Sequence, residues 1–147
     1  MTCRKCRESL TDSKIKVEEG SRKAVFLNDA RAQMHRTRVD GCLVRNRVAA
    51  DFVVSAVETG DVVVELKGKD VVHAVEQILE TASELATCER KRGPFGGLVV
   101  CNQYPRIDTK IQKLKAQFAK VYKGPVHVVT KNYEFRLERV LSFAGPF

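Results

Sequence analysis

The sequence lacks several features that would identify a membrane, secreted or repeat protein. No apolar run approaches the roughly 20 residues that a membrane-spanning helix needs, and the start, MTCRKCRESL, lacks the apolar segment of a secretory signal. Internal repeats and low-complexity segments are also absent. We therefore expect a cytoplasmic protein, with 1–147 forming one domain and 1–20 forming a small cysteine-containing extension.

Acidic residues are the minority among the charged ones. The sequence has 18 aspartates and glutamates against 26 lysines and arginines, which gives a net charge of +8. Such a balance favours a polyanionic partner, because each lysine or arginine that meets a phosphate releases counterions. We take this partner to be DNA.

The five cysteines are too few and too widely spaced to suggest a disulfide framework, and we expect thiols in a reducing compartment. Cys3 and Cys6 have the spacing of half a zinc site, and Cys42 with His35 could complete it. The alternative is that Cys3 and Cys6 are a pair of free thiols. Cys88 and Cys101 are expected in the core.

Periodicity predicts the order βββαβαββ, an α/β or α+β domain with a mixed sheet. Two short turns join the first three strands, and the uncharged run at 98–102 is typical of a strand buried on both faces. Residues 1–20 are predicted to be irregular, and 21–37 are ambiguous, with a possible short strand at 24–27 and a possible helix at 30–34. The predicted strands are 38–44, 50–57, 62–67, 98–102, 126–130 and 133–141, and the helices 70–88 and 108–122.

An acid and a base stand two residues apart at the end of the third strand. Side chains alternate along a strand, so Glu65 and Lys67 share one face. A short turn near 59–60 brings Asp51 beside Glu65, whereas Asp61 lies at the far end of the same strand. Asp40 is a further candidate at this edge, or a turn residue before Gly41. Facing carboxylates repel without a cation, which predicts Mg²⁺ or Mn²⁺.

These residues resemble the PD-(D/E)xK superfamily of restriction-endonuclease-like nucleases: Asp51, then Glu65-Leu66-Lys67, then a helix carrying Gln77. The resemblance covers roughly residues 38–102. It implies a restriction-endonuclease-like core, with Asp51 and Glu65 as metal ligands, Lys67 acting on the attacking water and Gln77 supporting the site. Ala50 stands where the family name has proline, and no glutamate on an earlier helix is evident.

The implied function is a Mg²⁺-dependent DNA endonuclease, expected as a homodimer whose two sites address two strands. The rivals are a catalytically inactive nucleic-acid-binding protein and a protein-interaction module on the same fold. Basic side chains near the proposed site would contact backbone phosphates without reading bases. The candidates are Lys69, Arg90, Lys91 and Arg92, the set Arg36, Arg38, Arg45 and Arg47, and the lysines of the second helix.

Overall fold

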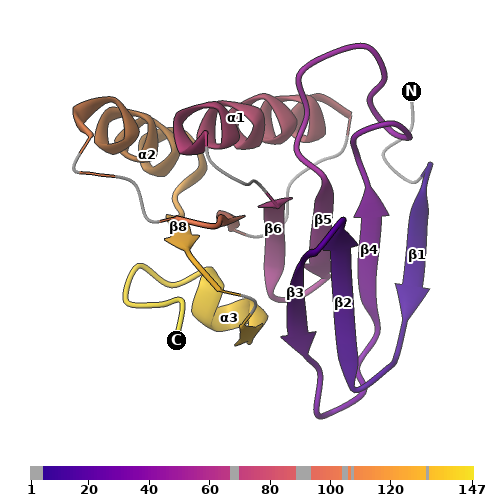
Figure 1. Ribbon diagram of the computed structural model, residues 1–147. Coiled ribbons are helices and arrows are strands. Elements are labelled where there is room, and N and C mark those ends of the chain that lie inside the picture. The colour runs from indigo at the N-terminus through magenta and orange to yellow at the C-terminus, as the bar shows by residue number, and fades with distance from the viewer. Residues whose placement is uncertain (1–4, 67–69, 89–93, 104–105, 107, 132) are drawn as a thin grey trace.

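The computed structural model describes residues 5–66, 70–88, 94–103, 106, 108–131 and 133–147. Its central feature is a six-stranded mixed sheet (Figure 1). The strands, in their order across the sheet, are β1 (Arg7–Leu10), β4 (Met34–Arg38), β5 (Phe52–Ala56), β6 (Gly60–Leu66), β7 (Phe95–Val100) and β8 (Val126–Val129). Neighbours from β1 to β6 are antiparallel, whereas β6, β7 and β8 run parallel.

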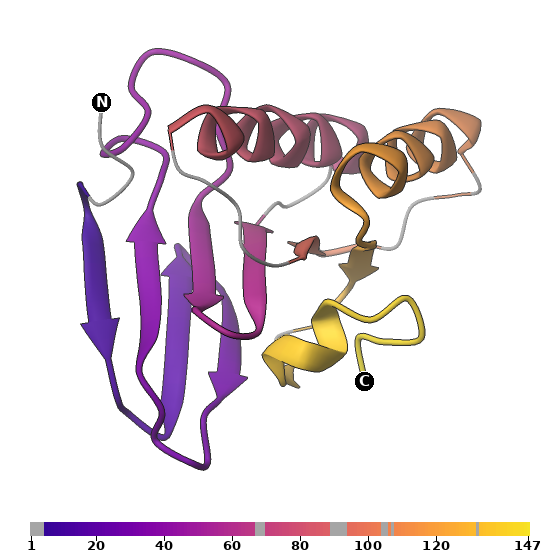
Figure 2. The same cartoon turned by 180° about the vertical axis from the view of Figure 1, so that it is seen from behind.

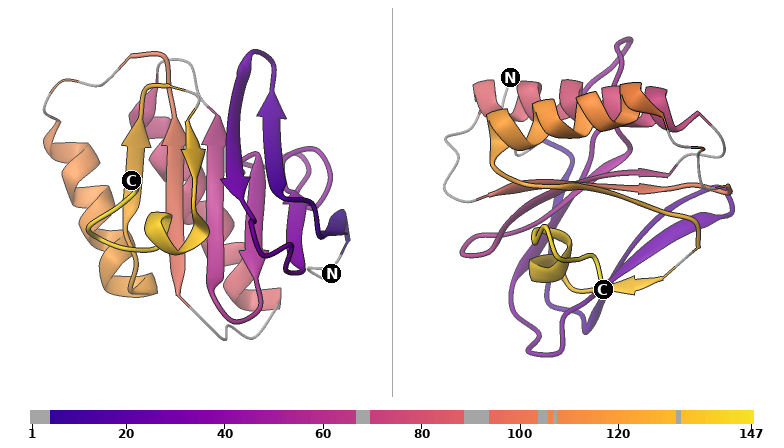
Figure 3. Two further views of the ribbon diagram at one scale, coloured as in Figure 1. Left: turned by 90° about the horizontal axis from the view of Figure 1, so that it is seen from below. Right: turned by 90° about the vertical axis from the view of Figure 1, so that its left-hand side faces the viewer.

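Two helices cover one face of this sheet (Figures 2 and 3). α1 (Val71–Cys88) joins β6 to β7 and α2 (Thr109–Tyr122) joins β7 to β8, since parallel neighbours need a crossover connection. The apolar stripe of α1, including Ile78, packs with Phe118 of α2 against Val63 of the sheet. No helix in the described part of the chain is long and apolar enough to cross a membrane.

A smaller sheet covers the other face, as the right-hand view of Figure 3 shows. It consists of β2 (Lys14–Glu19), β3 (Arg22–Leu27) and β9 (Glu134–Phe135), and the short helix α3 (Leu137–Val140) lies beside it. Alternate side chains of the large sheet enter this second apolar core. Both faces are thus buried, which leaves the strand ends as the places where polar side chains can gather.

The structure confirms a mixed α/β architecture and the central part of the predicted order. The predicted strands at 50–57, 62–67, 98–102 and 126–130 correspond to β5, β6, β7 and β8, and the predicted helices to α1 and α2. β7 is buried along its whole length and is parallel to both neighbours, as its uncharged sequence indicated.

The predictions toward the ends of the chain were wrong in three places. The strand predicted at 38–44 ends at Arg38, because the Val44 N–H bonds the Val39 carbonyl and Gly41 (φ +79°) turns the chain. The strand predicted at 133–141 is β9 followed by α3, where the Val140 N–H bonds the Arg136 carbonyl. Residues 1–20, predicted irregular, contain β1 and β2. β3 includes the possible strand at 24–27, whereas the possible helix at 30–34 is not formed and Met34 begins β4.

Gly97 allows α1 to lie close to β7. A Cβ at Gly97 would stand 2.9 Å from Cγ2 of Ile78 and 3.2 Å from Cγ2 of Val126. The neighbouring Gly96 points to the opposite face, where its Cβ would meet Cδ2 of Leu141 at 3.1 Å. The absence of a side chain at position 97 therefore sets the spacing between α1 and the sheet.

We expect Gly97→Ala to lower the free energy of unfolding by about 1–3 kcal/mol, because the added methyl overpacks the contact with Ile78. Gly96→Ala is the matched control and should cost less, since the end of the Leu141 side chain can move aside. Urea unfolding of both variants measures the difference. Equal losses would show that the spacing of α1 does not depend on Gly97.

Candidate functional site

Glu65 is a buried carboxylate at the end of β6. The residue is 2% exposed, and strand alternation turns its side chain to the face that α1 covers, as for Val63. It is paired in register with Val99 of β7. An acid in this position is unusual, because a charge is costly to remove from water unless its surroundings favour it.

Asp51 lies at the adjoining start of β5. The last registered pair between the two strands is Phe52 with Val64, so Asp51 stands one step further on, across from Glu65. The Leu66 N–H donates to Oδ2 of Asp51 at 2.9 Å. One Asp51 oxygen therefore lies against the peptide nitrogen that directly follows Glu65, and the register places the two acids on neighbouring positions of adjacent strands.

Side chains of α1 hold the backbone just before Asp51. Nε2 of Gln77 donates to the Ala49 carbonyl at 3.0 Å. One turn later, Oγ1 of the buried Thr81 accepts the Ala50 N–H at 2.8 Å. Gln77 thus supports the strand start, in line with its expected place near the site. Sequence reasoning missed Thr81, although a polar residue four positions after Gln77, beside the apolar stripe, was a usable signal.

Asp40 lies near this edge but is exposed. Its N–H donates to the Ala50 carbonyl, and it forms an isolated bridge with Val44. The turn therefore places the backbone of Asp40 beside Ala50. Within the described ranges, no three His, Cys, Asp or Glu side chains come close enough to hold a metal ion. A ligand role for Asp40 stays a prediction.

Several predicted site residues cannot be placed. Lys67, which the resemblance assigns to the attacking water, and Lys69 lie outside the described residues, as do the proposed phosphate contacts Arg90, Lys91 and Arg92. Arg45 is exposed on the loop between β4 and β5.

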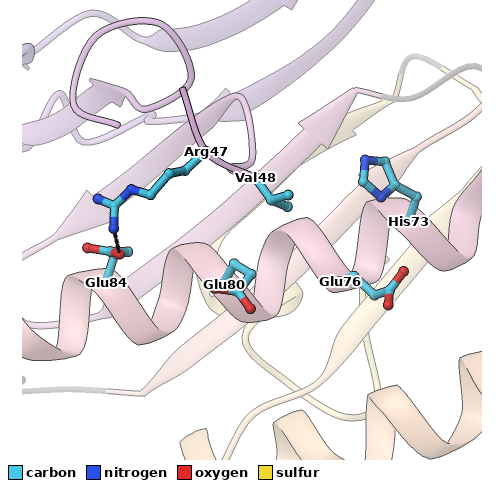
Figure 4. Close-up of a pocket in the computed structure, with 6 residues that line it drawn as sticks. All are labelled: Arg47, Val48, His73, Glu76, Glu80 and Glu84. Carbon is cyan, nitrogen blue, oxygen red and sulfur yellow. Dashed lines mark ion pairs between the residues drawn. The ribbon is translucent and has the colours of Figure 1, made fainter. Parts of the chain in front are cut away.

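Arg47 contributes to an acidic hollow beside α1 (Figure 4). It pairs with Glu84 at 2.8 Å. The hollow has a volume of about 430 Å³ and is lined by Arg47, Val48, His73, Glu76, Glu80 and Glu84. Three carboxylates along one helix flank would repel a phosphate. The hollow is therefore a poor match for the predicted phosphate contact at Arg47, and His73 faces it from the start of α1.

Two of the cysteines differ from their predicted states. Cys6 and Cys42 form a disulfide, with their Cα atoms 6.1 Å apart, so the expectation of thiols was wrong for this pair. Neither sulfur is then the thiolate that zinc requires, and Cys3 lies outside the described residues. Cys101 is buried as predicted, and burial raises the pKa of its thiol, which keeps it protonated and unreactive.

Comparison of the chain with protein-family models, with curated proteins and with solved structures finds no match. The residues where β5 begins and β6 ends are therefore the features that bear on function.

We expect Thr81→Val to lower the free energy of unfolding by about 1–3 kcal/mol, because the valine leaves the buried Ala50 N–H without its acceptor. Thr81→Ser keeps the hydroxyl and should cost only about 0.8 kcal/mol for the lost methyl. Urea unfolding gives both values.

Amide hydrogen exchange provides the local measurement. The Ala50 N–H should exchange faster in Thr81→Val than in Thr81→Ser, because only the valine removes its hydrogen bond. Identical stability and exchange in the two variants would mean that the hydroxyl does not hold the chain before Asp51.

Proposed function

We propose that the protein is a metal-dependent endonuclease of the PD-(D/E)xK type that hydrolyses phosphodiester bonds in DNA. The observation that carries the proposal is the position of the Asp51 carboxylate, 2.9 Å from the peptide nitrogen after Glu65. The buried Glu65 and the half-buried Asp51 therefore lie at the same end of two adjacent strands.

The donor set suits a magnesium ion. Mg²⁺ is commonly bound through one or two carboxylates, while waters and substrate phosphate oxygens complete its coordination. Asp51 and Glu65 supply two carboxylates, so a third protein acid is not required. The second Asp51 oxygen is available for this role, because the hydrogen bond from Leu66 engages Oδ2. The burial of Glu65 strengthens its attraction for a cation, since the local dielectric constant is low.

Each residue then has a separate task. Glu65 and Asp51 would hold the ion, and the Leu66 N–H fixes the orientation of Asp51. Gln77 and Thr81 restrain the preceding backbone, so Asp51 does not have to be ordered during the reaction. Lys67, two positions after Glu65, would orient the attacking water. When bound, the cation supplies water activation and neutralises charge on the transferred phosphate.

The surrounding fold supports the same proposal. Three antiparallel strands, β4, β5 and β6, are followed by a helix and a parallel strand, as a restriction-endonuclease-like core would require. The net charge of +8 suits a polyanionic substrate. A homodimer remains a prediction. The two rival functions, an inactive nucleic-acid-binding protein and a protein-interaction module, differ from the nuclease in whether DNA is bound and cleaved.

We expect the wild-type protein to nick or linearise supercoiled plasmid in Mg²⁺ or Mn²⁺ and to be inactive in EDTA. Glu65→Gln, Asp51→Asn and Lys67→Ala should each lower the rate by at least about 100-fold, comparable to the loss of a group that stabilises the transition state. The amide variants keep the shape of each side chain. Gel electrophoresis of time courses measures the rates.

Asp61→Asn is the matched control, because it removes a carboxylate from the opposite end of the same strand and should leave the rate unchanged. Wild-type rates in both Glu65→Gln and Asp51→Asn would show that the site assignment is wrong. DNA binding without cleavage under every metal would favour the inactive nucleic-acid-binding protein, and the absence of both would favour the protein-interaction module.

A further inference from the structure

Arg38 is an exposed cation at the same end of the strands as the proposed site. It is the last residue of β4 and is paired in register with Phe52, the residue that follows Asp51. Its guanidinium lies 5.7 Å from the centroid of the Phe52 ring, and its side chain is 54% exposed. The Arg38 backbone is fixed through its N–H to the Cys6 carbonyl. A rigid strand end therefore presents this charge at the same end of the strands as Asp51, on the face of the sheet that carries Phe52 and the small sheet.

Arg36, two residues earlier, provides an internal comparison on the same face of β4. Its guanidinium donates to Oε1 of Glu8 at 2.9 and 3.1 Å and to the Lys16 carbonyl at 2.6 Å. Only 25% of its side chain is exposed. Through these contacts Arg36 connects β1, β2 and β4, so its guanidinium is not available to an external ligand.

Arg38 is held much more weakly. Its contact is with Oε2 of Glu19 at 3.5 Å, and both side chains are about half exposed. An exposed pair at this distance contributes little to stability. Glu19 ends β2 and precedes Gly20 (φ +62°) in the hairpin turn. In Figure 1 the arrowheads of β2, β4 and β6 point to the same end of the molecule, and Glu65 is the second-last residue of β6.

We propose that Arg38 binds a backbone phosphate of the nucleic acid next to the bond that is cleaved, and that Glu19 occupies Arg38 when no substrate is bound. This inference rests on the proposed nuclease function and adds a substrate contact to it. A phosphate can replace the Glu19 carboxylate because it offers the guanidinium a charged acceptor with better geometry. The contact is to the backbone, so it carries no base specificity.

The experiment measures binding of a fluorescein-labelled DNA duplex by fluorescence anisotropy in EDTA, where no cleavage occurs. We expect Arg38→Gln to raise the Kd about tenfold and to reduce the slope of log Kd against log salt concentration by about one, as for one lost phosphate contact. The change should be the same for two duplexes of unrelated sequence. A loss confined to one duplex would overturn the assignment to a phosphate.

Glu19→Gln and Glu8→Gln form the decisive pair. Each removes one negative charge next to an arginine of β4, but only Glu19→Gln releases Arg38. We expect Glu19→Gln to lower the Kd severalfold at low salt and Glu8→Gln to change it less. The gain should vanish in the Glu19→Gln and Arg38→Gln double variant. Equal gains in the two single variants would show a net-charge effect and overturn the proposal.

Plasmid cleavage separates this inference from the proposed function. If the wild-type protein cleaves DNA while Arg38→Gln retains wild-type affinity and salt slope, only the role of Arg38 is overturned. If the wild-type protein neither binds nor cleaves nucleic acid, the nuclease function and this inference are both overturned. Urea unfolding of Arg38→Gln checks that the lost contact with Phe52 leaves the fold intact.

Discussion

The pairing of β5 with β6 is the constraint on which the candidate site depends. Their register sets Phe52 opposite Val64, and the Leu66 N–H then reaches the Asp51 carboxylate one step beyond. A shift by one residue would turn Glu65 to the opposite face and expose the apolar side chains of both strands. The same packing that stabilises the two cores therefore also brings the acids together, and no separate binding element is needed.

The helix α1 has two functions in this arrangement. Its apolar stripe packs on the sheet, with Gly97 permitting a close approach to Ile78. Its polar margin, Gln77 and Thr81, bonds the backbone that leads into Asp51. Because one rigid helix makes both sets of contacts, a change in its packing also moves the start of β5. Stability and the geometry of the site are coupled through a short segment of chain.

The sequence was sufficient to predict elements whose pattern is local and strong. The β-branched run of β6, the stripe of α1 and the uncharged β7 were all recognised, and with them the meeting of Asp51 and Glu65. The small sheet was missed, although β2 alternates charged residues with the buried Ile15 and Val17. At the C-terminal end, alternation could not show that the pattern changes from strand to the single turn of α3. The Cys6–Cys42 disulfide depends on a long-range approach that spacing does not reveal.

Net charge alone does not identify a binding surface, because many of the cations are already engaged within the fold. Arg36, Arg47 and Arg136 lie 2.9, 2.8 and 2.7 Å from carboxylate oxygens of Glu8, Glu84 and Asp29. The longer contact of Arg38 with Glu19 distinguishes it from these pairs, although all four arginines look alike in the sequence. A polyanion can bind a cation whose ion pair within the fold is weak and whose backbone is fixed near the strand ends that carry the proposed site. Arg38 meets both conditions at the strand ends that carry Asp51 and Glu65, where the two carboxylates would otherwise repel the substrate.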